Sequence, residues 1–296
     1  MFVNDEMKAR IIEAMKNARE NFGGSDAKFA TSLSINAAQY SRVMRGDMEK
    51  VLSDEKWITI ARILGVGIGT QTDWKTANTP VFQFITTQLE KCQEESLSAL
   101  LCDMSDIGKT YAALHYQRNH KNVVYVDCSQ VKSKQKLIRK IAKSFGVGST
   151  GRYDDVYEDL VFYLKQLPTP LVILDEAGDL HYEAFLEIKA LWNATERACG
   201  YYMMGADGLR QKIRRAIDNK KVGYTEIFSR FGRKYIQCVP DNTEKRESFL
   251  QQTAAMIIKA NCKEGTDVQK VLRSACDEYG VPSLRRINKE LSKIQG

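Results

Sequence analysis

The sequence has no long apolar run, and nothing in it approaches the roughly 20 consecutive apolar residues that a membrane-spanning helix needs. Its first ten residues lack the layout of a secretory signal, in which positive charge precedes an apolar stretch. The seven cysteines include no C-x-x-C pair, and the three histidines show no metal-ligand spacing. These absences argue against a membrane protein, a disulfide-rich secreted domain and a zinc site. We therefore expect a cytoplasmic protein with reduced thiols and no membrane contact.

The sequence has a positive net charge that is concentrated in two segments. The chain has 296 residues, 43% of them hydrophobic and 27% charged, with a net charge of +7, so it has room for several modules. Residues 1–75 are nearly neutral, with 11 basic and 10 acidic residues. Residues 201–240 hold nine basic and three acidic residues, and residues 131–145 hold six basic residues and no acid. These two surpluses favour a polyanionic partner, although any single lysine can simply be solvated.

The rest of the sequence is organised around a strand followed by Gly-Lys-Thr. Residues 97–102 predict a buried strand, and Gly108, Lys109 and Thr110 would open a helix over residues 111–119. Strand, loop, Gly-Lys-Thr and helix form the phosphate-binding arrangement of P-loop nucleotidases, because backbone N–H groups and the helix dipole both favour an anion there. Lys109 would reach the outer phosphates of a nucleotide, and Thr110 would offer its hydroxyl to Mg²⁺.

Two acidic residues depart from this pattern within residues 103–108, the candidate phosphate loop. Asp103 stands where G-x-x-x-x-G-K-[ST] has its first glycine, and Asp106 stands where many such loops have another. Carboxylates beside a triphosphate repel it unless they turn outward, so the two acids put nucleotide turnover in question.

A second acidic signal lies downstream of the loop. Residues 171–174 are apolar and precede Asp175 and Glu176, which predicts a buried parallel strand with acids at its carboxyl end. We expect Asp175 to hold Mg²⁺ and Glu176 to polarise an attacking water. An isolated strand of this kind more often ends in a solvated turn, but the Gly-Lys-Thr loop upstream favours a nucleotide site.

Residues 1–66 predict an all-helical domain of short capped helices. Residues 29–46 place two of these helices around a tight turn and resemble the lambda-repressor-like helix-turn-helix family, whose second helix enters the major groove of DNA. The resemblance implies that Gln39 and Arg42 face DNA and that Arg45 lies near a phosphate. The near-neutral charge of this part also fits a small domain that contacts protein.

The middle of the chain predicts an α/β fold. Residues 67–80 are rich in turn residues and predict a linker. Residues 81–240 then alternate strands with helices, which predicts a parallel sheet covered by helices on both faces. A strand over residues 123–127 falls between the phosphate loop and the acidic strand, an order that differs from kinase-like and Ras-like P-loop proteins. The last expected strand covers residues 233–238.

The end of the chain predicts helices alone. Residues 241–296 contain three amphipathic stretches, and the second of them spans residues 266–279. We expect this segment to form a small helical lid on the sheet domain.

A phosphate-loop core followed by a helical lid resembles the AAA+ ATPases, and with a helix-turn-helix in front the whole chain resembles the MuB family of phage transposition proteins. In AAA+ proteins an arginine at the Ser-Arg-Phe position reaches the nucleotide of the neighbouring subunit, which implies Arg230, with Arg233 as the other candidate. The lid arginine of the family matches Arg285 or Arg286. The motifs that carry the resemblance are Gly108-Lys109-Thr110, Leu171 to Glu176, Phe228-Ser229-Arg230-Phe231 and Ser283-Leu284-Arg285-Arg286.

The resemblance implies an activity as well as a fold. Such a protein binds ATP and Mg²⁺ at subunit interfaces, forms a helical oligomer or filament on double-stranded DNA without sequence preference, and presents that DNA to a transposase. Its affinity for DNA should fall steeply with salt, because basic residues supply phosphate contacts. The expected DNA contacts form two groups that the sequence does not rank. They are Lys132, Lys134, Lys136 and Arg139 after the second strand, and Lys212, Arg214 and Arg215 after the fourth.

Two other interpretations stay open from the sequence. A helicase-loader-like ATPase would share the fold and act on a helicase instead of a transposase. A DNA-binding regulator with an impaired nucleotide site would explain Asp103 and Asp106. Ala206 stands where members of the family often carry a water-positioning Thr or Asn, which together with the two loop acids puts the rate of hydrolysis in question more than nucleotide binding.

Overall fold

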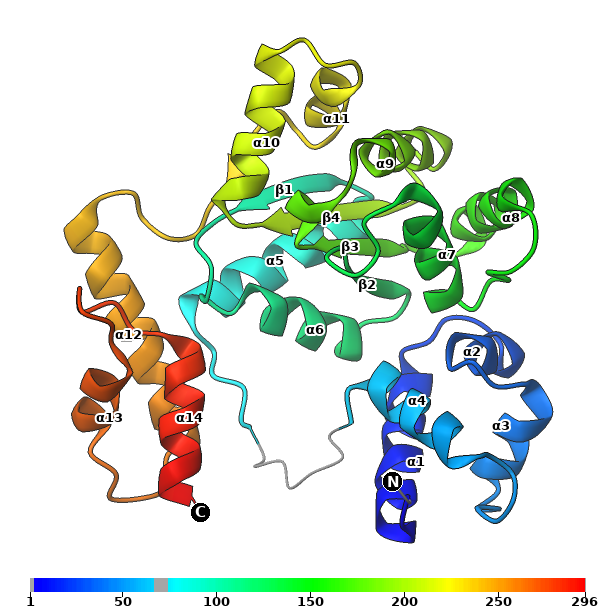
Figure 1. Cartoon of the computed structure of the whole chain (residues 1–296), viewed down its shortest axis with the longest axis horizontal. Helices are drawn as coiled ribbons and strands as arrows, with labels where there is room; N and C mark the ends of the chain where they lie inside the picture. Colours follow the sequence, from blue (N-terminus) through cyan, green and yellow to red (C-terminus); the bar gives the residue numbers. More distant parts are fainter. Residues whose placement is uncertain (1–2, 67–73, 296) are drawn as a thin grey trace.

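The computed structural model describes residues 3–66 and 74–295, which form a central sheet with two all-helical units beside it (Figure 1). Buried hydrophobic residues make four clusters, one on each face of the sheet and one in each helical unit. Residues 67–73 of the predicted linker lie outside the described residues, and the predicted domain boundaries at residues 66, 80 and 240 stay predictions. Within the described ranges, no helix is long and apolar enough to cross a lipid bilayer.

Polar side chains fix where the helices of the N-terminal unit begin. Asn4, Ser25, Asn36 and Ser53 each accept a hydrogen bond from the backbone N–H three residues on, which satisfies a donor that the first turn of a helix leaves free. The fully buried side chain of Trp57 lies in the core between these helices. The helices are α1 (Asp5–Glu20), α2 (Asp26–Ser32), α3 (Ala37–Met44) and α4 (Asp54–Leu64). The predicted all-helical N-terminal unit is confirmed.

Five parallel strands form the sheet, in the order β2-β3-β4-β1-β5. The strands are β1 (Ser98–Cys102), β2 (Val123–Asp127), β3 (Leu171–Asp175), β4 (Gly200–Gly205) and β5 (Tyr235–Ile236). The inner strands are buried along almost their whole length, because helices cover both faces. All paired strands run parallel, so the predicted parallel sheet is confirmed. β4 separates β1, which precedes the phosphate loop, from β3, which ends in Asp175.

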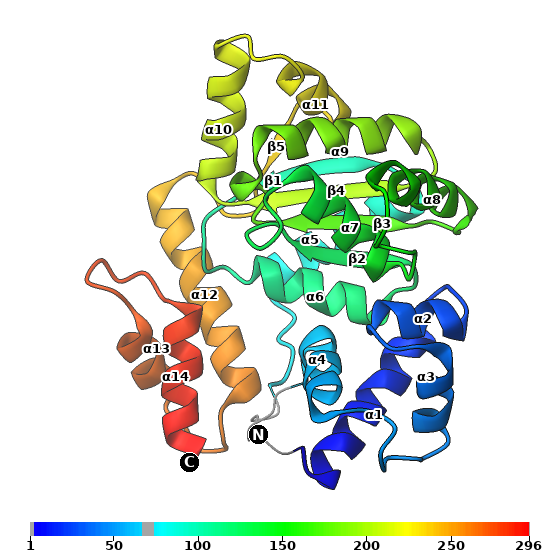
Figure 2. The same ribbon diagram turned by 45° about the vertical axis from the view of Figure 1, so that its right-hand side comes forward.

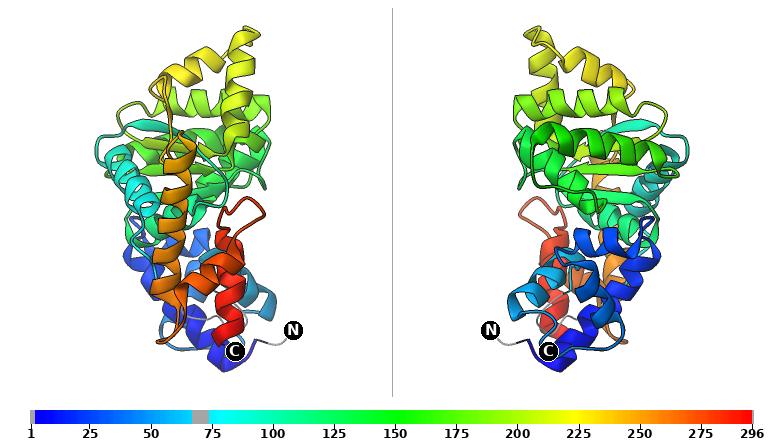
Figure 3. Two further views of the ribbon diagram at one scale, coloured as in Figure 1. Left: turned by 90° about the vertical axis from the view of Figure 1, so that its left-hand side faces the viewer. Right: turned by 90° about the vertical axis from the view of Figure 1, so that its right-hand side faces the viewer.

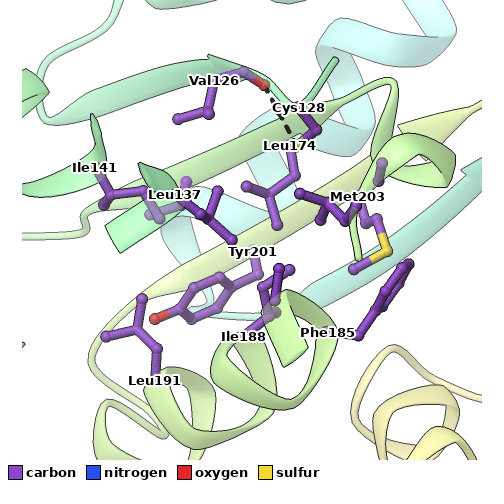
Figure 4. Close-up of a cluster of buried hydrophobic side chains, with 14 of the residues drawn as sticks. Val126, Cys128, Leu137, Ile141, Leu174, Phe185, Ile188, Leu191, Tyr201 and Met203 are labelled. Atoms are coloured by element: carbon purple, nitrogen blue, oxygen red, sulfur yellow. Dashed lines mark hydrogen bonds between the residues drawn. The ribbon is translucent and has the colours of Figure 1, made fainter. Parts of the chain in front are cut away.

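One face of the sheet packs against the helices that follow β2, β3 and β4. Figure 4 shows this core, in which Leu137 of α7 and Ile188 of α9 pack around Leu174 and Tyr201 of the strands. Successive strand residues point to opposite faces, so alternate residues of each strand enter this cluster. The elements on this face are α7 (Lys134–Ser144), α8 (Tyr153–Gln166), the 3₁₀ turn η1 (Ala177–Asp179), α9 (Tyr182–Ala194), α10 (Asp207–Asp218) and α11 (Tyr224–Arg230).

The opposite face is covered by α5 (Pro80–Glu94) and α6 (Lys109–Asn119). Leu101 of β1, Ile173 of β3 and Tyr202 of β4 point to this side and join Ile85 and Leu89 of α5 in a second cluster. The prediction of helices on both faces is therefore confirmed.

β5 is shorter than the strand predicted over residues 233–238. Arg233 adopts a left-handed backbone conformation with φ 53°, which ends regular extension on one side. On the other side, the backbone N–H groups of Cys238 and Val239 donate to the carboxylate of Asp103. Pairing with β1 is consequently limited to the two residues of β5.

Three helices form the C-terminal unit. They are α12 (Thr243–Asn261), α13 (Val268–Ala275) and α14 (Leu284–Gln295), and they share a small apolar core. α13 is shorter than the predicted helix over residues 266–279. The Asp267 side chain caps its first turn, and Cys276 forms an isolated antiparallel bridge with Pro282, so the helix ends at Ala275.

The two helical units meet the core at opposite ends of α6. Near its beginning, a Cβ atom placed on Gly108 would lie 3.7 Å from Leu284 of α14. Near its end, Asn21 Nδ2 donates to the carbonyl of Arg118 at 2.6 Å. Figures 2 and 3 show that both units lie on the α6 side of the sheet, away from α10 and α11. The N-terminal unit therefore contacts the core at the end of α6 that is opposite the phosphate loop.

Candidate functional site

The predicted nucleotide residues come together at the carboxyl edge of the sheet. The phosphate loop follows β1, Asp175 ends β3, and α10 follows β4. The parallel register places these strand ends side by side, with Cys102 paired to Gly205 and Asp127 paired to Asp175. Open α/β sheets bind their ligands at this edge.

The beginning of α6 offers backbone donors to an anion. Gly108 has φ 94° and ψ 14°, a left-handed conformation that glycine adopts without the strain a side chain would add. Among the described residues, no side chain caps α6, so the N–H groups of its first turn stay available for a ligand. Together with the helix dipole, they favour a phosphate group at this position.

Lys109 lies inside the phosphate loop, with only 6% of its surface exposed. Its Nζ donates to the backbone carbonyl of Asp103 at 3.1 Å and to that of Met104. Burial lowers the pKa of Lys109, and the negative charges of Asp103, Asp175 and Glu176 act in the opposite direction. A buried ammonium group held by neutral carbonyls gains more from an anionic acceptor, so the geometry fits a phosphate.

Asp103 does not face the interior of the loop. Its side chain is buried, and Oδ2 accepts hydrogen bonds from the backbone N–H groups of Cys238 (2.6 Å) and Val239 (3.0 Å), while Oδ1 accepts from that of Met104 (2.7 Å). Three N–H donors satisfy this buried carboxylate. The acid that replaces the first loop glycine thus ties the loop to the segment between β5 and α12.

Asp106 also turns away from the loop, in the direction of α14. Its Oδ2 accepts a hydrogen bond from Ser283 Oγ at 2.7 Å, and its Oδ1 lies 3.9 Å from Arg285 Nε. The repulsion expected between the two loop acids and a triphosphate is reduced, because each carboxylate is engaged by hydrogen-bond donors or an arginine of its own.

Asp175 and Thr110 meet as the sequence predicts for a shared metal ion. Thr110 Oγ1 donates to Asp175 Oδ2 at 2.6 Å, and the hydroxyl of Tyr125 donates to the same oxygen at 2.8 Å. The other oxygen accepts the backbone N–H of Glu176 at 2.8 Å. In residues 3–66 and 74–295 no group of three or more His, Cys, Asp and Glu side chains could hold a metal by itself. That arrangement fits Mg²⁺, which proteins usually bind through one or two carboxylates together with substrate phosphates.

Glu176 follows in a left-handed conformation, with φ 50° and ψ 39°. The turn points its carboxyl group away from the buried strand, so the residue is exposed while Asp175 is buried. Partial burial raises the pKa of Glu176, the charge of Asp175 raises it further, and Lys109 opposes the shift. A carboxylate with a raised pKa is a better acceptor for a proton from water.

Arg230 and Arg233 lie apart from this edge of their own chain. Arg230 Nε donates to Asn193 Oδ1 at 2.6 Å, and its guanidinium lies 5.3 Å from the ring of Trp192 on α9. Arg233 is exposed and bonds Ser229 Oγ at 3.3 Å. The structure therefore does not bring either arginine to the phosphate loop, and the predicted reach to a neighbouring subunit stays a prediction.

The two candidate lid arginines differ in their surroundings. Arg285 is 88% exposed at its side chain and faces Asp106 of the phosphate loop. Arg286 instead donates to the backbone carbonyl of Cys276 at 2.9 Å, within the C-terminal unit. Arg285 is thus the one whose contact lies on the phosphate loop.

The two basic groups that the sequence left unranked meet at η1. Lys132 forms an ion pair with Asp179 at 3.2 Å. Lys212 Nζ donates to the backbone carbonyls of Gly178 (2.7 Å) and Leu180 (2.5 Å). Burial lowers the pKa of Lys212, and Asp179 opposes that effect. The amine of Lys212 therefore anchors α10 to η1, which leaves it less accessible to DNA than its neighbours.

The other basic residues of these groups also divide into anchored and exposed side chains. Lys134 Nζ lies 5.6 Å from the ring of Tyr153, and Arg139 donates to the carbonyls of Ser149 (2.8 Å) and Gly151 (2.9 Å). The exposed members are Lys136, Arg214 and Arg215.

The candidate DNA residues of the N-terminal unit are bonded within that unit. Gln39 donates to the carbonyl of Val51 at 3.3 Å and accepts from Lys56 Nζ at 3.1 Å. Arg42 pairs with Asp47 at 2.6 Å, and Arg45 Nε donates to a carbonyl one turn earlier in α3. The side-chain amide of Gln39, which the resemblance implies would face DNA, is therefore already engaged inside the unit.

The sequence did not predict the contacts of two residues at the site. Tyr125 is an ordinary member of a predicted strand, and its partner Asp175 lies 50 residues away. Ser283 belongs to a motif that the sequence singled out, but its partner Asp106 lies 177 residues away. Neither spacing carries a signal, because both pairs depend on how separate elements pack.

The chain is similar to several known proteins. A protein-family model described as an AAA domain matches residues 82–213. Over 193 residues the chain is 25% identical to the Mu-like prophage FluMu DNA transposition protein B of Haemophilus influenzae, a match that covers 65% of this chain and 63% of that protein. Among solved structures, the Orc1 protein of Aeropyrum pernix in complex with DNA is similar, with a TM-score of 0.45 and 15% identity, covering 75% of this chain and 66% of that one.

The AAA-domain match contains the phosphate loop, the Asp175 strand and the first half of α10. It thus coincides with the edge of the sheet where Lys109, Thr110 and Asp175 converge. The parallel sheet order and the helical unit after β5 complete the fold expected from the sequence. Residues 82–213 of this chain therefore match an AAA domain, and the chain is similar to the DNA transposition protein B of a Mu-like prophage.

Proposed function

We propose that the chain is an ATP-dependent DNA-binding ATPase that assembles on target DNA without sequence preference and recruits or activates a transposase. The observation that carries the proposal is the convergence of Lys109, Thr110 and Asp175 at one edge of the sheet. The relationship to a DNA transposition protein B supports the transposition role.

The residues at this edge have distinct roles in the proposal. The first turn of α6 and Lys109 hold the phosphates of ATP, while Thr110 and Asp175 hold Mg²⁺. ATP would supply a phosphoanhydride bond, whose hydrolysis consumes one water and releases ADP and phosphate. Glu176 takes a proton from water at its carboxylate, which its raised pKa favours.

The position of Arg230 supports self-association. Its contacts are with Asn193 and Trp192, away from the phosphate loop of the same chain. We propose that Arg230, or Arg233 beside it, reaches the nucleotide of a neighbouring copy, so that ATP joins subunits into a helical oligomer. A guanidinium group suits this role because it is always charged and binds phosphate through two donors.

We assign DNA contact to the exposed basic residues of α7 and α10 and to Lys132, which precedes α7. Lys136, Arg214 and Arg215 are exposed, and Lys132 is only partly engaged by Asp179. Contacts of this kind go to phosphates and carry no sequence information, which suits a non-specific target binder.

The test combines hydrolysis with imaging. Phosphate release from Mg·ATP should rise when long duplex DNA is added, and Lys109→Ala should abolish it, while the exposed Lys165→Ala on α8 should behave as the wild type. Electron microscopy with a nonhydrolysable ATP analogue should show filaments on duplex DNA. Discrete rings on single strands would instead favour a helicase loader, and a wild type that binds no nucleotide would favour a DNA-binding regulator.

A further inference from the structure

The phosphate loop contains a carboxylate that links it to the C-terminal unit. Asp106 has φ 59°, in the left-handed region that glycine adopts most easily and that Asp tolerates better than most residues. A glycine here would fit the backbone and leave the loop without a side chain. The chain instead has a carboxyl group that reaches across to α14.

The link has two parts of different strength. Ser283 Oγ donates to Asp106 Oδ2 at 2.7 Å and also accepts the backbone N–H of Arg286 at 3.3 Å, so one hydroxyl joins the loop to the first turn of α14. Asp106 Oδ1 lies 3.9 Å from Arg285 Nε. The hydrogen bond is the firmer part, since Ser283 is partly buried beside the loop.

The ion pair is the exchangeable part. The Arg285 side chain is 88% exposed and that of Asp106 is 28% exposed, and pairs this open to water are worth little. A more highly charged anion near the loop can therefore draw Arg285 away from Asp106 at small cost. The hydrogen bond to Ser283 does not depend on that exchange.

We propose that Asp106 is a positioning residue of the nucleotide site. Its hydrogen bond to Ser283 sets α14 against the phosphate loop, and its charge holds Arg285 until the phosphates of a nucleotide compete for that arginine. The second half of this inference rests on the proposed nucleotide binding, while the first half concerns the protein without nucleotide.

Two substitutions separate the hydrogen bond from the charge. Asp106→Asn removes the charge but keeps an oxygen that can accept from Ser283, and Asn tolerates the left-handed conformation. Asp106→Gly removes both and suits the backbone better than Asp does. Glu290→Gln, which breaks the ion pair of Glu290 with Lys293 elsewhere on α14, is the matched control for loss of a carboxylate.

Hydrogen exchange of the nucleotide-free protein tests the positioning of α14. Amides of residues 283–291 should exchange about fivefold faster in Asp106→Gly than in the wild type, the size of one lost hydrogen bond. Asp106→Asn should exchange like the wild type. Equal exchange in all three proteins would overturn the link between the loop and α14.

Calorimetric binding of Mg·ATP tests the competition for Arg285. Asp106→Asn should tighten binding about two- to fivefold, the size of an exposed charge interaction, and Glu290→Gln should leave it unchanged. In an Arg285→Ala background the same Asp106→Asn change should gain less than about twofold, because the shared partner is gone. Unchanged or weaker binding by Asp106→Asn, or an equal gain without Arg285, would contradict the competition.

Failure of the proposed ATPase function can be distinguished from failure of the proposed role of Asp106. A wild type that takes up no Mg·ATP refutes both the proposed ATPase function and the competition for Arg285. The exchange comparison is made without nucleotide, so it still decides whether Asp106 positions α14.

Discussion

The carboxyl edge of the sheet and the N-terminal helical unit both contain polar residues that the sequence singles out, but the two regions use them differently. At the edge, groups from distant segments converge on a buried carboxylate, as when Thr110 meets Asp175 65 residues away. In the N-terminal unit the partners are local and exposed, as when Arg42 pairs with Asp47 five residues on. Convergent buried charge is costly without a function, whereas local exposed pairs cost little. This comparison supports the proposal that the chemistry lies at the carboxyl edge of the sheet.

Substitution of the proposed base should have the largest effect. Glu176→Gln should lower DNA-stimulated ATP hydrolysis about 100- to 1,000-fold, because a positioned base contributes about that much, while Mg·ATP binding stays near the wild type. Phosphate release and calorimetry measure the two quantities. Loss of binding together with hydrolysis would mean that Glu176 has a structural role instead.

The raised pKa of Glu176 gives this prediction a pH dependence. The group must be unprotonated to accept a proton, so the hydrolysis rate should fall as pH falls through its pKa. Because partial burial and Asp175 raise that pKa above 4.5, the acid limb of the rate profile should lie at higher pH than for an unperturbed carboxyl. A profile without this limb would contradict the assignment of Glu176 as base.

Removal of the buried loop acid should be the next largest change. Asp103→Ala leaves the N–H groups of Cys238 and Val239 without their acceptor, and unsatisfied buried groups cost about 1–3 kcal/mol each. The free energy of unfolding in urea should fall by about 2–4 kcal/mol. Asp207→Ala, at a carboxylate that is 70% exposed, should change it by less than about 0.5 kcal/mol. Equal effects of the two variants would refute the anchoring role of Asp103.

Tyr125→Phe should have an intermediate effect. The substitution removes one of two hydroxyl donors to Asp175 Oδ2, and loss of such a supporting hydrogen bond costs about 10-fold in metal affinity. The Mg²⁺ concentration that supports half-maximal hydrolysis should rise by about that factor, while the maximal rate at saturating Mg²⁺ changes little. An unchanged Mg²⁺ requirement would show that Tyr125 does not orient the carboxylate.

Substitutions of the candidate DNA-binding residues should have the smallest effects. They compare α10, which follows a strand of the sheet, directly with the N-terminal unit. The double variant Arg214→Ala and Arg215→Ala should lower the slope of log affinity against log salt by about 1–2, because each phosphate contact contributes about 0.9. Arg42→Ala should change that slope by less than about 0.5, since Arg42 is paired with Asp47. A larger effect of Arg42→Ala would reverse the comparison and place DNA on the N-terminal unit.

Much of the fold follows from local sequence. The caps at Asn36 and Ser53 and the apolar run before Asp175 each act over a few residues, so pattern and spacing locate the helices and strands. The meeting of Thr110 and Asp175 was also predictable, because parallel strands end at a shared edge. The parallel topology then brings the ends of these strands, and the polar residues that follow them, to the same edge of the sheet.

The remaining contacts depend on packing between separate elements. The end of β5 at Ile236 and the outward turn of Asp103 have one cause, the hydrogen bonds that Asp103 accepts from residues about 135 positions away. The partner of Tyr125 likewise follows from the register of β2 on β3, with Asp127 beside Asp175. The spacing of these residues along the chain does not predict such pairs, because the pairs form only when separate elements pack together.

The central claim is that Lys109 and its neighbours bind ATP, and isothermal titration calorimetry with Mg·ATP tests it most directly. The wild type should bind one nucleotide per chain, and Lys109→Ala should lose that binding while Lys165→Ala keeps it. No heat of binding with the wild type, or equal binding by Lys109→Ala, would contradict the account.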